Sequence, residues 1–152
     1  MPVSVFSAAR HLCERGGWGL TNLKLQKILY LAHMIHLGEK QAPLINERFE
    51  AWDYGPVAPD LYRQVKAFGS APIRNVFHGF TAPQDAEIIN SLNEVQDQVG
   101  HLTAGQLVQI THRPGGAWDT HYIPGAMGVR IPNEAILLEY QERLQANAAA
   151  TH

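Results

Sequence analysis

The strongest constraint on the fold is one stretch of helical pattern, residues 22–36, whose apolar side chains cover most of its circumference. Five of them recur at helical spacing and four more fill much of the remaining surface: Leu25, Ile28, Leu29, Ala32 and Ile35, then Leu23, Tyr30, Leu31 and Met34. Thr21 is a good N-cap residue for this helix. A helix that is apolar on most sides is normally buried, so this pattern predicts a central helix surrounded by other elements.

Apolar periodicity predicts further helices around the central one. They cover residues 4–15, 55–68, 82–99, 104–110 and a last segment that starts at 132. Two of these helices are preceded by a capping-box pattern, in which a hydroxyl at the N-cap is followed by Gln three residues later. The pairs are Thr81 with Gln84, and Thr103 with Gln106.

The alternation of residues along 48–54 is typical of a short strand. We expect this strand to end at Gly55, where a Cβ would crowd a sharp turn, and Pro56 to lie in the first turn of the next helix. The predicted fold class is therefore mainly α. It is a single-domain helical bundle of about five to six helices, with a small β element near residues 47–54 and a candidate second one at 73–80.

Composition supports a folded domain and argues against nucleic-acid binding by this chain alone. Of the 152 residues, 45% are apolar and 17% are charged, which is enough for a core and too little charge for a disordered chain. This length suits one domain, which we place at residues 1–146, followed by a small polar tail at 147–152 that frays. The net charge of −2 provides no basic excess for contacts with a phosphate backbone.

The sequence also bears on the compartment. Its N-terminal residues lack the basic region and long apolar run of a signal peptide. No apolar stretch approaches the roughly 18 residues that a membrane span needs. We therefore expect a cytoplasmic protein without membrane contacts, in which the single cysteine, Cys13, is an inert buried thiol on an apolar helix face.

Several histidines are candidate metal ligands. His112, Asp119 and His121 could in principle bind a divalent metal, as in a small hydrolytic enzyme. Their other interpretation is structural, with His112 hydrogen-bonding a loop backbone beyond a helix. His33 and His36 share a helix face without a third ligand, so we interpret them as one packed and one rim histidine. Because no nucleophile elbow or phosphate-binding motif occurs, we expect no enzyme, no metal and no cofactor.

Acidic and aromatic residues gather around the predicted strand. Glu47 and Glu50 would point to opposite faces of the strand, so we interpret them as a solvated edge rather than an acid–base pair. Trp52, Tyr54 and Tyr62 lie within eleven positions, and Trp118 follows later near His112. Trp and Tyr are over-represented at binding hot spots, so these four aromatic residues are candidates for a partner-binding surface. The alternative, that a helix covers them and they are core, stays open.

Three segments together resemble the Panacea domain family, also described as SocA-like antitoxins and phage-associated GepA-like proteins. Their sequences are LTNLKLQKILYLAH (20–33), FEAWDYGPVAPDLY (49–62) and LVQITHRPGGAW (107–118). The residues that carry the resemblance are Leu25, Gln26, Lys27, Tyr30, Trp52, Tyr54, Gly55, Pro56, Tyr62, Thr111, His112 and Trp118. The resemblance spans about residues 5–145. The chain departs from the family pattern at Asp53, where lysine is frequent, and at 115–117, which give a looser approach to Trp118.

The resemblance implies an antitoxin that neutralises a co-encoded protein toxin by direct, stoichiometric binding, without catalysis. Such a function requires a complementary surface, commonly about 1,200–2,000 Å² of total buried area. Two alternatives of other classes remain: the metal-dependent hydrolytic enzyme that would use His112, Asp119 and His121, and a DNA-binding repressor. The sequence alone leaves the toxin, its contact surface and the oligomeric state open.

Overall fold

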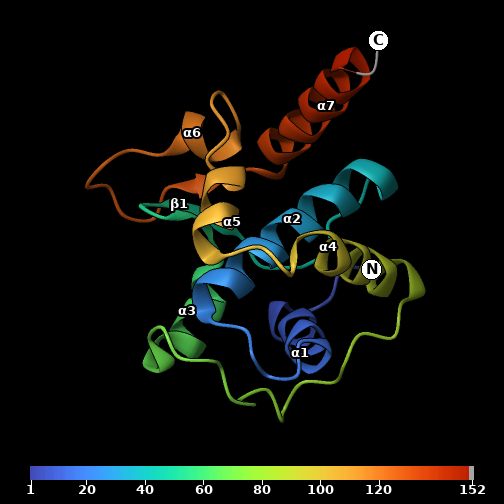
Figure 1. Cartoon of the computed structure of the whole chain (residues 1–152), viewed down its shortest axis with the longest axis vertical. Helices are drawn as coiled ribbons and strands as arrows, with labels where there is room; N and C mark the ends of the chain where they lie inside the picture. Colours follow the sequence, from blue (N-terminus) through green and yellow to red (C-terminus); the bar gives the residue numbers. More distant parts are fainter. Residues whose placement is uncertain (151–152) are drawn as a thin grey trace.

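A computed structural model describes residues 1–150 as a helical bundle with a small sheet on one side (Figure 1). Within these residues the elements are α1 (Val5–Arg15), α2 (Asn22–Lys40), β1 (Phe49–Trp52), β2 (Gly55–Val57), α3 (Pro59–Val65), the 3₁₀ helix η1 (Lys66–Phe68), α4 (Ala86–Val99), α5 (Ala104–Thr111), α6 (Ala117–His121), β3 (Arg130–Ile131) and α7 (Asn133–Ala150). The predicted mainly α class is confirmed. None of the helices in this range is long and apolar enough to cross a membrane.

Helix α2 is the central element, as its apolar circumference predicts. It packs against α1, α4, α5, α7 and strand β2 (Figure 1). Leu25, Leu29 and Ala32 have no exposed surface. The side chain of Thr21 caps the first turn, as expected, and the helix continues past the predicted end at residue 36 to Lys40. The rest of the bundle is arranged around this one buried rod.

The sheet has three antiparallel strands in the order β2–β1–β3. Strand β1 lies within the predicted segment, and its residue Trp52 pairs with Gly55 of β2. The prediction that Pro56 opens the next helix is wrong. Residues 55–57 instead turn back along β1 as an edge strand, a position where the missing N–H of a proline is tolerated. Helix α3 begins at Pro59, which occupies the first-turn position assigned by sequence to Pro56.

Two other local predictions are wrong. Residues 73–80 do not form a strand but run as an irregular segment at the bottom of the view in Figure 1. The backbone N–H of Ile73 donates a hydrogen bond to the carbonyl of Leu20, and the buried side chain of Phe77 also holds the segment in place. The third strand is the short β3 instead. Helix α4 is capped by Asp85 rather than by Thr81, since the Asp85 carboxylate accepts the N–H groups of the first turn.

At the other helix start the capping box is confirmed. Thr103 accepts the backbone N–H of Gln106 at 3.1 Å, and the Gln106 side chain accepts the N–H of Thr103 at 2.9 Å. Helix α7 runs through Ala150, so residues 147–150 of the expected tail are helical, while 151 and 152 lie outside the described residues. The domain boundary at 146 stays a prediction.

Helices α2 and α7 approach closely where Gly38 faces the ring of Tyr140. A Cβ at position 38 would lie 2.5 Å from Cγ of Tyr140, and two other ring carbons would be closer still. Cγ is attached directly to the Cβ of Tyr140, so the ring cannot make room for a side chain at position 38 unless α7 itself shifts. The absence of a side chain at Gly38 is therefore what permits this helix–helix contact.

We predict that Gly38→Ala lowers the free energy of unfolding by about 1–3 kcal/mol, because overpacking the α2–α7 contact outweighs the better helix propensity of alanine. Urea denaturation measures this change. Gly105→Ala is the matched control, since a Cβ at this exposed position of α5 meets no atom nearer than 4.0 Å. The control should be neutral or stabilised by up to about 1 kcal/mol. Equal losses in the two variants would contradict the packing explanation.

Candidate functional site

The β1–β2 hairpin carries the most exposed of the predicted site residues. Its turn consists of Asp53 and Tyr54, and 70% of the Tyr54 surface is exposed. Gly55 follows with φ +110°, a conformation that side chains rarely adopt. A Cβ there would lie 3.0 Å from Oγ1 of Thr111 and 3.1 Å from Cε of Lys27. The expected need for glycine at this turn is confirmed.

Two buried polar side chains of α2 hold the return strand of this hairpin. Oε1 of Gln26 accepts the backbone N–H of Ala58 at 2.9 Å. Nζ of Lys27 donates to the carbonyl oxygen of Pro56 at 2.9 Å. Both side chains come from the central helix and satisfy backbone groups just after the turn. The hairpin is thereby fixed to the best-packed element of the fold.

Lys27 is unusual because it is fully buried and no carboxylate pairs with it in residues 1–150. Burial lowers the pKa of Lys27 from its ordinary 10.5 to about 7. Burying a charged amine without a carboxylate partner costs free energy, so burial favours the neutral form of Lys27. Its hydrogen bond to the Pro56 carbonyl is retained in either form.

A stack of aromatic rings supports the hairpin from the other side. The rings of His112 and Trp118 lie parallel with centroids 3.7 Å apart, and Tyr122 stacks on Trp118 at 4.7 Å. The indole N–H of Trp118 donates to the carbonyl of Trp52 at 2.7 Å. Burial is the main cause that lowers the pKa of His112, so its ring is held neutral in this stack. Trp118 therefore works as a brace behind the hairpin, with 8% of its surface exposed.

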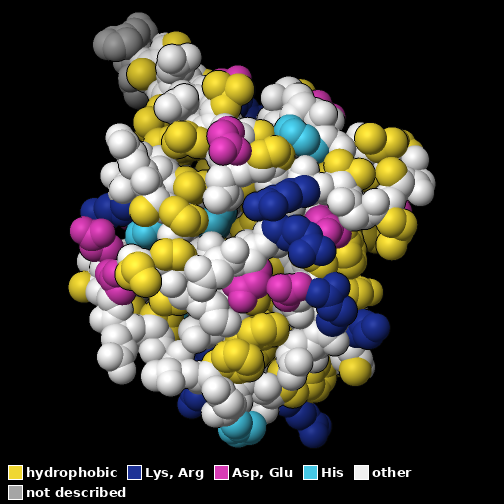
Figure 2. Space-filling view, turned by 180° about the vertical axis from the view of Figure 1, so that it is seen from behind, with side chains coloured by type: hydrophobic (Ala, Val, Ile, Leu, Met, Phe, Trp, Pro, Cys, Tyr) yellow, Lys and Arg dark blue, Asp and Glu magenta, His cyan; other side chains and the backbone are white. Residues whose placement is uncertain are grey.

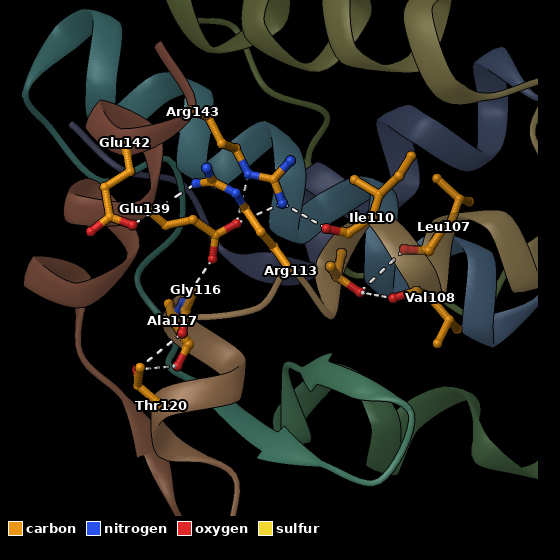
Figure 3. Close-up of polar contacts among 11 residues, drawn as sticks. Leu107, Val108, Ile110, Arg113, Gly116, Ala117, Thr120, Glu139, Glu142 and Arg143 are labelled. Carbon is orange, nitrogen blue, oxygen red and sulfur yellow. Dashed lines mark hydrogen bonds and ion pairs between the residues drawn. The ribbon is translucent and has the colours of Figure 1, made fainter. Parts of the chain in front are cut away.

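Helix α6, which carries Trp118, is positioned by a buried carboxylate of α7, that of Glu139 (Figure 3). One oxygen of Glu139 accepts the N–H of Ala117, the first residue of α6, at 2.7 Å. The other oxygen accepts from Arg143 at 2.7 Å, and Arg143 also donates to the carbonyl of Ile110 in α5 at 2.6 Å. A Cβ at Gly116 would lie 2.5 Å from Glu139, so glycine is required there. This network ties α5, α6 and α7 together under Trp118.

In front of the hairpin lies a groove of about 610 Å³, which we call the aromatic groove. Its walls come from α2, the hairpin, α3 and the segment 122–129. Its main lining side chains are Leu23, Trp52, Asp53, Tyr54, Tyr62, Tyr122 and Met127. The indole N–H of Trp52 donates to buried Glu50 at 3.1 Å, and the Trp52 and Tyr62 rings meet edge to face at 4.8 Å. The groove is therefore preformed, with its largest ring fixed in place.

The structure brings three of the four predicted aromatic residues together. Trp52, Tyr54 and Tyr62 line the aromatic groove, whereas Trp118 lies one layer behind it. Trp118 is thus mostly buried and the other three are at least partly exposed, while contact of any of them with a partner stays a prediction. Sequence reasoning missed Tyr122 and Met127, because they come from a segment without periodicity that reaches the hairpin only through the fold.

The alternative metal site is not assembled. His112 stacks on Trp118, Asp119 accepts the N–H of Gly115 at 2.8 Å, and His121 contacts the carbonyl of Ala117 at 2.8 Å. Among residues 1–150, no group of three His, Cys, Asp or Glu side chains is placed to hold a metal ion. The residues proposed for the hydrolytic enzyme are therefore engaged in separate local contacts.

Other sequence interpretations fare differently. The rim assignment for one of the two α2 histidines is wrong, since both His33 and His36 are buried. Nδ1 of His33 accepts backbone N–H groups from residues 44 and 45, and burial lowers its pKa to about 4. Glu50 is likewise buried rather than solvated, because it bridges Trp52 and Arg48. Cys13 is buried as expected, and burial raises its pKa to about 12.

Comparison with known proteins identifies the family. The family model described as Antitoxin SocA-like, Panacea domain matches residues 25–119. The chain belongs to this SocA-like Panacea family. It is also 39% identical over 131 residues to the protein named Antitoxin SocA of Caulobacter vibrioides (strain NA1000 / CB15N), covering 77% of this chain and 70% of that relative. No solved structure matches the chain.

Within this Panacea domain, the motif residues of the three segments meet at the hairpin. Gln26 and Lys27 bind its backbone, Thr111 and His112 pack against Gly55, and Trp118 donates to it. Three segments that are far apart in the sequence thus all contact and position the β1–β2 hairpin. The motif residues position the aromatic groove, and only part of them line it.

We predict that the free energy of unfolding rises with pH between pH 7 and about pH 8.5, because Lys27 is protonated in the unfolded chain and largely neutral in the folded one. The unfolded state binds more protons in this window, so the slope approaches about 1.4 kcal/mol per pH unit. Urea titrations across this window measure the slope.

Lys27→Met provides the comparison, and its slope in this window should be near zero. The buried histidines do not contribute to this slope, because their pKa values are lowered from 6.5. Their effect, an increase in the free energy of unfolding as the pH rises, is confined to pH values below about 6.5. The raised pKa of Cys13 lowers stability only above the ordinary thiol pKa of 9.0. The same slope in wild type and variant would contradict a neutral Lys27.

We predict that Glu139→Gln destabilises the fold by about 3–5 kcal/mol, because it leaves Arg143 half-buried without its carboxylate. Thermal and urea denaturation measure the loss. Glu142→Gln is the matched control on the same helix, since this carboxylate is 45% exposed and lies 3.9 Å from Arg113. The control should change stability by less than about 1 kcal/mol. A small effect at Glu139 would show that α6 does not depend on this network.

Proposed function

We propose that this protein is an antitoxin that neutralises a co-encoded protein toxin by direct stoichiometric binding in the cytoplasm, without turnover. The observation that carries the proposal is membership of the SocA-like Panacea family, together with the similarity to a relative that is named an antitoxin. The preformed aromatic groove supports binding as the mode of action, since rigid aromatic anchors lose little conformational entropy when a partner docks.

The groove has the composition of a protein-binding surface. Two of the large side chains that line it are mostly exposed, Tyr54 (70%) and Met127 (89%), and Ile123, which follows the lining residue Tyr122 in the chain, is also exposed (56%). Figure 2 shows apolar side chains gathered on the lobe at the right of the view, the side to which segment 122–129 projects. Exposed apolar clusters of this kind mark interaction sites on soluble proteins.

The charge of the groove favours a protein partner over DNA. No Lys or Arg is among its lining residues, and its one charged side chain is the carboxylate of Asp53. A surface that binds a phosphate backbone needs the opposite sign. Beneath the groove, Lys27, Gln26 and Trp118 already hydrogen-bond the hairpin backbone, which supports a positioning role for these polar groups.

The test is co-expression with the product of the neighbouring gene. We expect that product to arrest growth alone and this protein to restore growth and to co-purify with it at a fixed ratio. Tyr54→Ala should weaken the complex by about 2 kcal/mol, roughly thirtyfold in affinity, with an unchanged melting temperature because the ring is exposed.

Two further variants make the test selective. Leu144→Ala removes a similarly exposed apolar side chain from α7, away from the groove, and should leave binding unchanged. Trp118→Ala should lower the melting temperature along with binding, because it removes the brace behind the hairpin. A harmless neighbouring gene product, or failure both to rescue growth and to co-purify, would exclude this function.

A further inference from the structure

The aromatic groove contains a single charge, and that charge is held in place. Asp53 is an exposed residue of the hairpin turn, and its Oδ1 accepts a hydrogen bond from the Tyr122 hydroxyl at 2.5 Å. This bond is the main cause that raises the pKa of Tyr122, so the phenol remains the donor. Within residues 1–150 no cation pairs with Asp53, and no hydrogen bond occupies its Oδ2.

The uncompensated state of Asp53 contrasts with its acidic neighbours. Glu50, two positions before the β1 end, is neutralised by Arg48 at 2.8 Å. Asp60, at the start of α3, pairs with Arg63. Asp53 therefore brings a carboxylate without a cationic partner to a groove whose other lining residues are all uncharged.

The rings around this carboxylate suit a cation as well. Trp52 and Tyr62 meet edge to face at the groove, and Tyr54 and Tyr122 line it together with Asp53, so four aromatic side chains border the space beside the carboxylate. The negative face of an aromatic ring attracts a cation, and an aromatic wall combined with a carboxylate is the arrangement used to bind organic cations. The hydrogen bond from Trp52 to Glu50 fixes the position of the indole ring in the groove before any ligand binds.

We propose that the aromatic groove receives an arginine side chain of the protein partner, with the guanidinium stacked on the rings and hydrogen-bonded to Oδ2 of Asp53. A planar guanidinium stacks on flat rings and is more weakly hydrated than an ammonium, so arginine fits this groove better than lysine. A purely apolar side chain would bury the Asp53 carboxylate with the Tyr122 hydroxyl as a donor but no cation to balance the charge, which is unfavourable. The inference rests on the proposed function only for the statement that the partner is a protein.

The test uses single-residue probes instead of the partner. N-acetyl-arginine amide is titrated into the isotope-labelled protein while the indole N–H signal of Trp52 and the backbone signal of Asp53 are followed by NMR. The uncharged isostere N-acetyl-citrulline amide and the lysine and leucine amides are titrated in parallel. We expect the arginine probe to shift both signals with millimolar affinity, about tenfold tighter than the citrulline probe.

Asp53→Asn should weaken arginine binding about three- to tenfold and remove most of the preference over citrulline. Asp97→Asn is the control, since this exposed carboxylate on α4 pairs with Arg15 away from the groove. It should leave both titrations unchanged. Equal binding of citrulline, equal or tighter binding of lysine or leucine, or a preference retained in Asp53→Asn would overturn the proposal. If the probes fail while growth rescue succeeds, this inference falls and the antitoxin function stands.

Discussion

The arrangement of the whole site depends on the hydrogen bonds that α2 makes to the β1–β2 hairpin. A two-stranded ribbon with strands of four and three residues is marginally stable by itself. Gln26 and Lys27 attach its return strand to the most deeply buried helix of the bundle. The turn that carries Asp53 and Tyr54 lies at the surface, but the strand that follows it is thereby tied to the core.

This attachment uses polar groups where apolar ones would contribute more stability. A buried lysine without a carboxylate costs free energy, and the fold accommodates it by favouring the neutral amine. The polar contacts fix the position of the hairpin relative to α2, because Lys27 can donate to the Pro56 carbonyl in only one register of the hairpin against the helix. The Glu139–Arg143 pair fixes α6 in the same way, so two buried polar clusters set the two sides of one groove.

The sequence predicts the elements whose signals are local and leaves out those that depend on distant partners. The apolar circumference of residues 22–36 and the Thr103 capping box are local, and both are confirmed. Strand β2 was missed because a Gly-Pro pair suits a helix start as well as an edge strand, and only pairing with β1 decides between them. The spacing of Glu139 and Arg143 indicates at most an ordinary i,i+4 pair on a helix, whereas the structural role of Glu139 depends on an N–H group twenty-two positions away.

The segment 122–129, which supplies Tyr122 and Met127 to the groove, is anchored at both ends and exposed at residues 123–128. It leaves α6, which Glu139 caps, and enters β3, which pairs with β1. Two glycines with positive φ, Gly125 and Gly128, shape the exposed turn between these anchors. Changes in length or sequence within 123–128 would alter one wall of the groove while leaving the stack of Tyr122 on Trp118 in place. The fold thus combines a frame that is fixed by buried contacts with one groove wall that is exposed and irregular.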